Sequence, residues 1–210
     1  MGAFRDTIST ETELREAIGG LPNPLALAKD VGRLDEHCRA YIAHSPFVLL
    51  ATSGADGRCD VSPKGDAPGF VLVLDEQRLL IPDRPGNRRL DGMSNLLHNP
   101  HIGLIFLIPG MEETLRVNGR GCIVRDAELL ARCEMRGKIP TLGIGVEVEE
   151  AFIHCAKAFK RSGMWEPARW PNLEEMPSAA QMLLDHTRQP GVTVEQMKDR
   201  LEEGYRTRLY

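Results

Sequence analysis

The feature that most constrains the fold is a succession of short strand-like runs between residues 47 and 152, separated by turns. The first, Phe47–Thr52, is continuously apolar, which predicts a strand buried on both faces. Asp56-Gly57 follows it and is a strong hairpin signal. Only short helical segments interrupt the later runs, so we expect an antiparallel barrel of six to seven strands in a mainly β (α+β) chain. The expected strands are residues 47–52, 59–62, 70–74, 79–81, 101–108, 113–125 and 142–152.

Helical patterns flank this strand-rich region on both sides. A Ser or Thr followed by Glu predicts a helix start near residue 11, and Gly19-Gly20 predicts its end. A second helix is expected over residues 34–43, and a short one over 127–136. We expect residues 1–45 to be a helical cover, 46–170 the barrel, and 171–210 helices that pack on the barrel or on a dimer partner. With 210 residues, these parts form one domain overall.

A basic turn after the 79–81 strand is the first candidate binding element. The strand stops at Pro82, a turn rich in Pro and Gly follows, and Arg88-Arg89 stand before a predicted helix over residues 90–97. The first amides of a helix lack internal partners, and guanidinium groups pair with phosphate oxygens, so this turn suits an anion. Alternatively, the two arginines only form part of a solvent-exposed helix face. Two cations at the N-terminus of a helix interact unfavourably with the helix dipole, however, unless an anion lies between them.

A second basic turn, Ser62-Pro63-Lys64-Gly65, ends the preceding strand. Two such turns on either side of a hairpin suggest one phosphorylated ligand held between them. Neither the P-loop pattern nor the dinucleotide-binding glycine fingerprint is present in the chain.

Composition excludes several classes of partner. The net charge of −4 and the isoelectric point near 5.9 argue against a nucleic-acid binder. No apolar run approaches the ~20 residues of a membrane helix, and the first residues lack a secretory apolar core, so we expect a cytoplasmic protein without a membrane partner. The five cysteines are widely spaced, and we expect them to be reduced thiols. No metal site is expected, since His98 and His101 lack a matching ligand set.

Several segments together resemble the FMN-binding split barrels of the pyridoxamine 5'-phosphate oxidase-like family, in particular its bacterial branch of FMN-dependent enzymes of unknown substrate. The resemblance extends over roughly residues 35–170 and rests on the order of its pieces more than on any single motif. The segments that carry it are CDVSPKG from Cys59, LLIPDRPGNRR, the helix LDGMSNLLHNP running into HIGLIFLIP, the strand RVNGRG and the later HCAKAFKRSGMW.

The resemblance implies a split barrel that binds FMN at the interface of a homodimer. By position, Arg88 and Arg89 hold the FMN phosphate with Asn87 beside them, and Lys64 lies nearest the reacting end of the flavin. Lys157, Arg161 and Trp165, from the C-terminal half of the chain, serve the flavin of the partner subunit, and Thr114 or Arg116 reaches the flavin ring. The implied cofactor-binding residues are Cys59, Asp60, Val61, Ser62, Lys64, Ile81, Pro82, Asn87, Arg88, Arg89, Thr114, Arg116, Lys157, Arg161 and Trp165.

The implied activity is that of an FMN-dependent oxidoreductase acting on an unknown small molecule, with no catalytic residue assigned. A flavin brings the redox chemistry itself, so the protein needs no nucleophile or dyad. The last residues, YRTRLY, lack the R-x-H pattern of true pyridoxamine phosphate oxidases, which disfavours vitamin B6 phosphates as substrates. Alternatives are a flavin- or haem-binding protein without turnover, a deazaflavin in place of FMN, and a purely structural dimer. Only His98, His101 and His154 favour haem.

Overall fold

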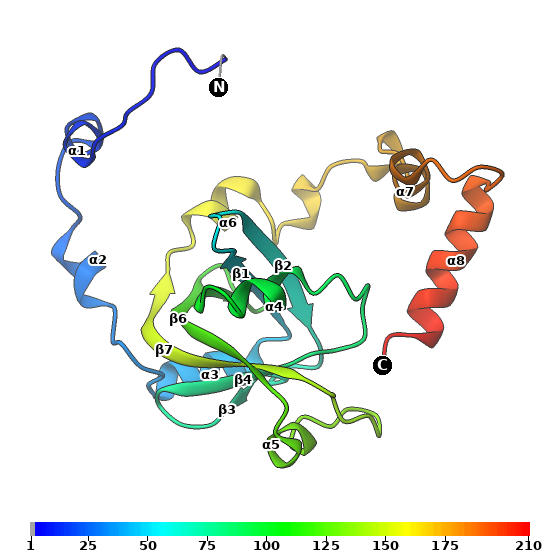
Figure 1. Cartoon of the computed structure of the whole chain (residues 1–210). Coiled ribbons are helices and arrows are strands. Elements are labelled where there is room, and N and C mark those ends of the chain that lie inside the picture. Colours follow the sequence, from blue (N-terminus) through cyan, green and yellow to red (C-terminus); the bar gives the residue numbers. More distant parts are fainter. Residues whose placement is uncertain (1–2) are drawn as a thin grey trace.

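Seven antiparallel strands form a single sheet in the order β2-β1-β5-β6-β7-β4-β3 (Figure 1). The computed structural model describes residues 3–210. The sheet is open, with β2 and β3 at its edges, and the predicted mainly β class and antiparallel split barrel are confirmed. The strands are β1 (Phe47–Ser53), β2 (Cys59–Gly65), β3 (Leu72–Val73), β4 (Arg78–Pro82), β5 (His101–Leu107), β6 (Thr114–Val124) and β7 (Gly143–His154).

The core lies on the inner face of this curved sheet. Along β1, Val48 and Leu50 are buried, whereas Leu49 and Ala51 are only partly buried. The prediction that this strand is buried on both faces is therefore wrong. Its neighbours β2 and β5 continue the sheet on either side, and no helix of the described chain covers their outer face, so one face stays accessible.

A β-bulge interrupts the pairing of β6 with β7 between Asn118 and Gly119, where Glu149 of β7 is the extra residue. A Cβ atom at Gly119 would overlap the backbone carbonyl of Glu147 on the neighbouring strand. Only glycine allows the two backbones to approach so closely. The bulge bends the long β6–β7 pair and thereby helps to curve the sheet.

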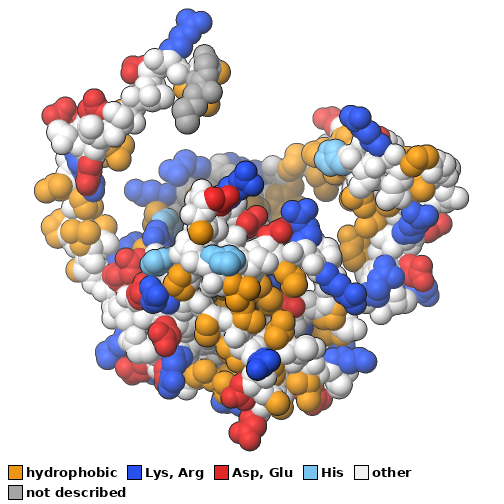
Figure 2. All heavy atoms as spheres, viewed as in Figure 1, with side chains coloured by type: hydrophobic (Ala, Val, Ile, Leu, Met, Phe, Trp, Pro, Cys, Tyr) orange, Lys and Arg blue, Asp and Glu red, His pale blue; other side chains and the backbone are white. Residues whose placement is uncertain are grey.

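The segment before the barrel stands away from it (Figure 1). Helix α1 (Glu11–Ile18) begins at Thr10 with a capping box and ends at Gly19, both as predicted. Neither α1 nor α2 (Pro24–Ala28) has a buried residue. Figure 2 shows apolar side chains on this arm clear of the body of the molecule, so among the described residues the arm has no cover.

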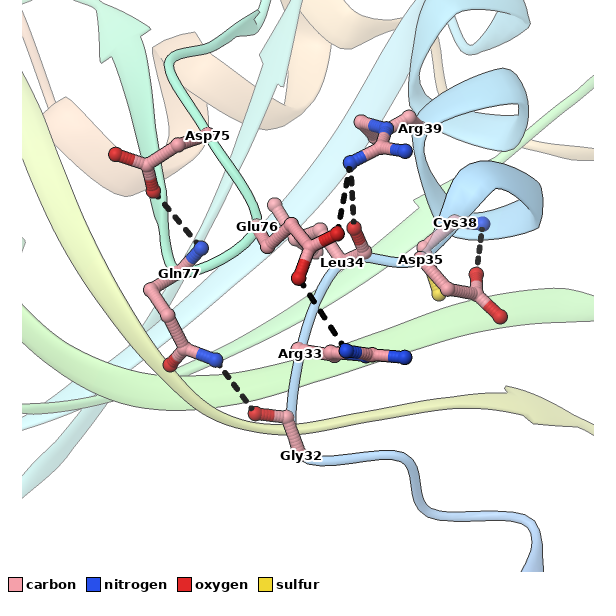
Figure 3. Close-up of polar contacts among 9 residues, drawn as sticks. All are labelled: Gly32, Arg33, Leu34, Asp35, Cys38, Arg39, Asp75, Glu76 and Gln77. Carbon is pink, nitrogen blue, oxygen red and sulfur yellow. Dashed lines mark hydrogen bonds and ion pairs between the residues drawn. The ribbon is translucent and has the colours of Figure 1, made fainter.

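Residues 29–35 attach this arm to the barrel and lead into α3 (Glu36–His44), whose Cys38, Tyr41 and Ile42 enter the core. The attachment is a set of contacts with the turn between β3 and β4 (Figure 3). Glu76 accepts from Arg33 at 3.3 Å and faces Arg39 at 3.7 Å, while Gln77 donates to the carbonyl of Gly32 at 3.2 Å. The turn and α3 therefore hold each other in place.

Two inserted helices are shorter than the patterns predict. Helix α4 (Asp91–Leu96) packs on β1 and β2. Helix α5 spans only Ala127–Ala131, whereas residues 127–136 are predicted to be helical. The chain turns there instead, with Arg136 in the left-handed region and a bridge between Met135 and Lys138.

The last part of the chain forms helices α6 (Lys157–Ser162), α7 (Ala179–Thr187) and α8 (Val194–Thr207), with two short 3-10 turns, Pro167–Arg169 and Leu173–Glu175, between α6 and α7. Helices α7 and α8 pack on each other through Ala180 and Met197, both buried. Thr193 caps α8. None of the helices in residues 3–210 is both long enough and apolar enough to cross a bilayer.

Candidate functional site

A groove of about 1160 Å³ lies between the barrel edge and α8. One wall comes from β2 and the loop 83–93, the floor from residues 138–144, and the other wall from α8 and the three residues after it. In Figure 2 the molecule is hollowed between its body and the last helices, with Lys and Arg side chains along the hollow. We refer to this feature as the groove.

Strand β2 presents alternate side chains to the groove. Asp60, Ser62 and Lys64 lie on one face and are partly buried, because period-two geometry points them toward α4 and the loop. Asn95 of α4 donates to Asp60 at 2.8 Å and to Thr52 of β1 at 3.1 Å. This amide fixes the short helix, and with it the basic loop, against the strand edge.

The loop 83–90 carries the two arginines and has unusual backbone geometry. Arg88 and Leu90 both adopt φ of 60°, the left-handed region that residues other than glycine rarely enter. Left-handed residues are also a component of the turns whose backbone N–H groups form anion-binding nests. Asn87 accepts from the amide of Arg89 at 3.0 Å, and no side chain caps α4 at Leu90. Strain of this kind is typical of ligand-binding loops.

Positive charge dominates the groove. Seven Lys or Arg residues line it against three Asp residues. Lys64 pairs with Asp83 at 3.3 Å and Arg89 with Asp91 at 2.7 Å. Within residues 3–210, no ion pair engages Arg88, Lys138 or Arg208. Charges of one sign that face a concave site without partners raise the local concentration of ligands of the opposite sign, so the groove is suited to anions.

Asp66 joins the two walls at one end of the groove. Its side chain is fully buried and accepts hydrogen bonds from Arg84 Nε at 2.6 Å, Tyr210 Oη at 2.6 Å and the amide of Ala67 at 2.8 Å. Burial acts to raise the pKa of Asp66, but the bonds from Tyr210, Ala67 and Arg84 outweigh it, and the pKa is lowered. Asp66 is therefore ionised at neutral pH. The Tyr210 pKa is raised by its bond to this carboxylate.

The structure brings about half of the predicted cofactor-binding residues together in the groove. Those from the basic loop and, except for Cys59, those from β2 line it. They are Asp60, Val61, Ser62, Lys64, Asn87, Arg88 and Arg89. Two independent segments of sequence therefore meet at one site.

The other predicted residues lie outside the groove lining. Ile81 and Pro82 are buried in β4, Thr114 is buried at the start of β6, and Cys59 lines a separate pocket. Arg116 lies over the Phe152 ring, 5.2 Å from its centroid. The remaining three belong to α6 and the loop after it; they are Lys157, Arg161 and Trp165. Trp165 donates to the carbonyl of Met111 at 3.0 Å and stacks on Phe159.

The separate pocket, of about 440 Å³, opens on the outer side of β1, β5 and β6 and includes His101 and Glu150. His101 contacts Asn99 at 2.8 Å. His98 and His154 are exposed and line neither hollow. The three histidines that favour haem therefore do not converge on the groove.

Sequence reasoning missed the wall made by α8. Arg200, Gly204 and Arg208 follow one another at four-residue steps, as do Leu201 and Tyr205, and such spacing places residues on one helix face. This signal predicts a face with two arginines. It does not indicate what that face lies against, which only the fold decides.

Fold and groove together define a split-barrel protein with a cationic ligand groove at the sheet edge. Residues 34–155, more than half of the chain, match the family of pyridoxamine 5'-phosphate oxidase. The chain belongs to this family. The matched segment contains β2, the basic loop and the whole sheet, but ends before α6.

A comparison with curated proteins finds no match. Among solved structures, HupZ of Group A Streptococcus is 16% identical with a TM-score of 0.46, covering 57% of this chain and 92% of its own. HutZ, the haem storage protein of Vibrio cholerae, is 18% identical with a TM-score of 0.40, covering 58% and 94%. An FMN-binding protein from Syntrophomonas wolfei is 9% identical with a TM-score of 0.43, covering 69% and 96%. Likenesses this distant carry no functional inference.

Proposed function

We propose that this protein binds FMN in the groove and acts as an FMN-dependent oxidoreductase on a small molecule. The observation that carries the proposal is the meeting of β2 with the Arg88-Arg89 loop in one cationic groove, inside the segment that matches the family. When bound, the flavin supplies the hydride and electron transfer, and the protein supplies binding, orientation and electrostatics.

The residues present fit the phosphate end of such a ligand. Arg88 has no ion-pair partner in the described chain, and the exposed Arg89 has only Asp91. Both guanidinium groups are therefore available to phosphate oxygens, with Asn87 and loop amides beside them. The fit supports FMN over an apolar ligand, because such a ligand would leave these cations uncompensated.

Lys64 is expected nearer the ring. Its ammonium lies 3.3 Å from the Asp83 carboxylate, and both side chains are largely buried. The pair holds the lysine at the strand end rather than in solvent. A fixed cation there stabilises negative charge that develops on reduction of a bound flavin, since preorganised charge acts strongly in a partly dry site.

The proposed assembly is a homodimer in which the cofactor site is shared. Lys157, Arg161 and Trp165 lie outside the groove of their own chain, and we assign them to the site of the partner subunit. This assignment rests on the family resemblance, which places Thr114 or Arg116 beside the flavin ring instead. Lys157 and Arg161 are exposed, so a second chain could reach them.

Replacing both arginines, Arg88→Ala with Arg89→Ala, tests the phosphate assignment. Charge-assisted bonds to phosphate are lost, so FMN affinity should fall by at least about a hundredfold. Flavin fluorescence titration measures this, and circular dichroism checks the fold. The control Arg125→Ala with Arg132→Ala removes the same charge from exposed positions outside the groove. Equal FMN affinity in both double variants contradicts the assignment.

The absorption spectrum of the purified protein separates FMN from the alternatives. Bands of oxidised flavin support the proposal, and a Soret band identifies haem in its place. A protein that shows neither, and takes up no FMN on titration, is not a flavoprotein of this kind.

A further inference from the structure

The α8 wall of the groove lies outside the segment that matches the family. That segment ends at residue 155, and the groove residues of this wall run from Arg200 to Tyr210. The match to the family therefore gives no account of this wall. Yet the wall faces the same groove as the basic loop and contributes two further arginines.

The charges of this wall are not used within the described chain. Arg208 and, on the floor, Lys138 have no ion-pair partner, and Arg200 contacts only the neutral amide oxygen of Gln189 at 3.2 Å. Three cations that face the same groove repel one another unless an anion lies among them. If FMN phosphate occupies the Arg88-Arg89 wall, this second cationic wall remains for a different anion.

Apolar side chains accompany these cations. Ile139, Tyr205 and Leu209 line the groove and are 54%, 66% and 54% exposed. Exposed apolar surface inside a groove favours a ligand with an apolar or aromatic body. The volume of about 1160 Å³ exceeds the ~300–1,000 Å³ usual for one small ligand, which leaves room for a second molecule beside a flavin.

We infer that the α8 wall is the substrate subsite of the groove and that it takes a small organic anion with an apolar body. Arg200 and Arg208 bind the carboxylate or phosphate, with Lys138 below them, and Tyr205 packs on the body. This inference rests on the proposed function for its second occupant, the flavin.

Asp66 and Tyr210 position this wall. The Tyr210 hydroxyl donates to Asp66 at 2.6 Å, and the Arg136 guanidinium lies 4.7 Å from the centroid of the Tyr210 ring. Asp66 also holds Arg84 in the loop of the opposite wall. The width of the groove is therefore set by one buried carboxylate that contacts both sides.

The test titrates phenyl phosphate and, separately, benzoate into the FMN-loaded full chain by isothermal calorimetry. The variant Arg200→Gln with Arg208→Gln should weaken binding of the preferred anion by at least about tenfold, while FMN affinity stays within about threefold. The matched control, Lys198→Gln with Arg206→Gln, removes the same charge from α8 at positions that do not line the groove, and should bind as the wild type does. The better of the two probes identifies phosphate or carboxylate as the preferred group.

Tyr210→Phe provides a second variant that keeps every cation. Loss of its bond to Asp66 should weaken binding of the anion probe and leave FMN affinity unchanged. A general loss of stability would instead reduce both affinities. The inference is overturned if the wild type binds neither probe at up to about 10 mM. It is also overturned if the Arg200/Arg208 and control variants bind alike, or if FMN affinity falls as much as probe affinity.

Failure of the proposed function is distinguishable from failure of the subsite. If the wild type takes up no FMN, the titration is repeated on the flavin-free chain. Probe binding that survives Arg88→Ala with Arg89→Ala, but not Arg200→Gln with Arg208→Gln, then supports the subsite alone. The reverse pattern rejects it.

Discussion

At the scale of single residues, Asp66 is the side chain on which the geometry of the groove depends most. It is buried, it carries a charge at neutral pH, and its partners come from the basic loop and from the segment after α8. A buried carboxylate without such partners would be protonated or strongly destabilising. Arg84 and Tyr210 therefore each contribute to keeping this carboxylate ionised.

Asp66→Asn should destabilise the protein at pH 7 by about 1.5–3 kcal/mol, the usual worth of a hydrogen bond to a charged group. Because the folded-state pKa of Asp66 lies below its unfolded value of 3.8, its stabilisation is complete above that value and is lost as pH falls through the folded pKa. The difference between wild type and variant should therefore shrink from pH 5 toward pH 3. Urea unfolding at several pH values measures it, with Asp56→Asn in an exposed turn as the control. A difference that does not change with pH contradicts this account.

At the scale of elements, the β6–β7 pair illustrates how one residue shapes a strand. The extra residue, Glu149 of β7, shifts the register, so that Asn118 pairs with Glu150 while Gly119 pairs with Val148. Asn118 then donates to the Glu150 carboxylate at 2.6 Å. The bulge thus places polar side chains on the outer face while the strand's inner residues stay in the core.

Gly119→Ala should destabilise the fold by about 1–3 kcal/mol or more, because its Cβ would meet the Glu147 backbone, which cannot move away as a side chain can. Thermal unfolding by circular dichroism measures the change. The comparison variant is Gly92→Ala in α4, where the nearest atom to the new Cβ is Thr52 Oγ1 at 3.5 Å, and where alanine favours the helix. Equal melting temperatures for the two variants would show that the bulge tolerates a side chain.

At the scale of the whole molecule, two apolar surfaces have no cover within the described residues. The outer face of β1, β2 and β5 exposes Val61 and Ile105, at 66% and 37%, and Leu49 and Leu107 beside Ile105 are partly exposed. The α1–α2 arm exposes further leucines and isoleucines. A sheet with apolar residues on both faces is stable when both are covered. The proposed two-fold homodimer, the commonest closed assembly, would supply that cover.

Ile105→Glu should convert the dimer to a monomer, because it places a charge in the centre of this outer face. Light scattering at micromolar concentration measures the mass. Leu173→Glu, at a more exposed leucine outside the sheet, is the control and should remain dimeric. A wild-type monomer that still binds FMN tightly would refute both the dimer and the shared site.

The sequence by itself determined the features that depend on neighbours in the chain. Apolar runs between turns located the strands, and the Ser/Thr-Glu pattern and Gly19-Gly20 marked the two ends of the first helix. The basic turns at Lys64 and Arg88 were likewise visible, and the family resemblance joined them into one site. These signals are local, because caps, turns and strand alternation involve residues a few positions apart.

Only the tertiary structure decided what each face lies against. Tyr210 meets Asp66 across 144 residues of sequence, and no local pattern indicates that contact. The same holds for the α8 wall, for the half-open face of β1 and for the separation of Trp165 from the groove. Such pairings are set by how the sheet closes and by which surfaces remain for the last helices to cover, and a helix face with two arginines is equally compatible with solvent or with a ligand groove.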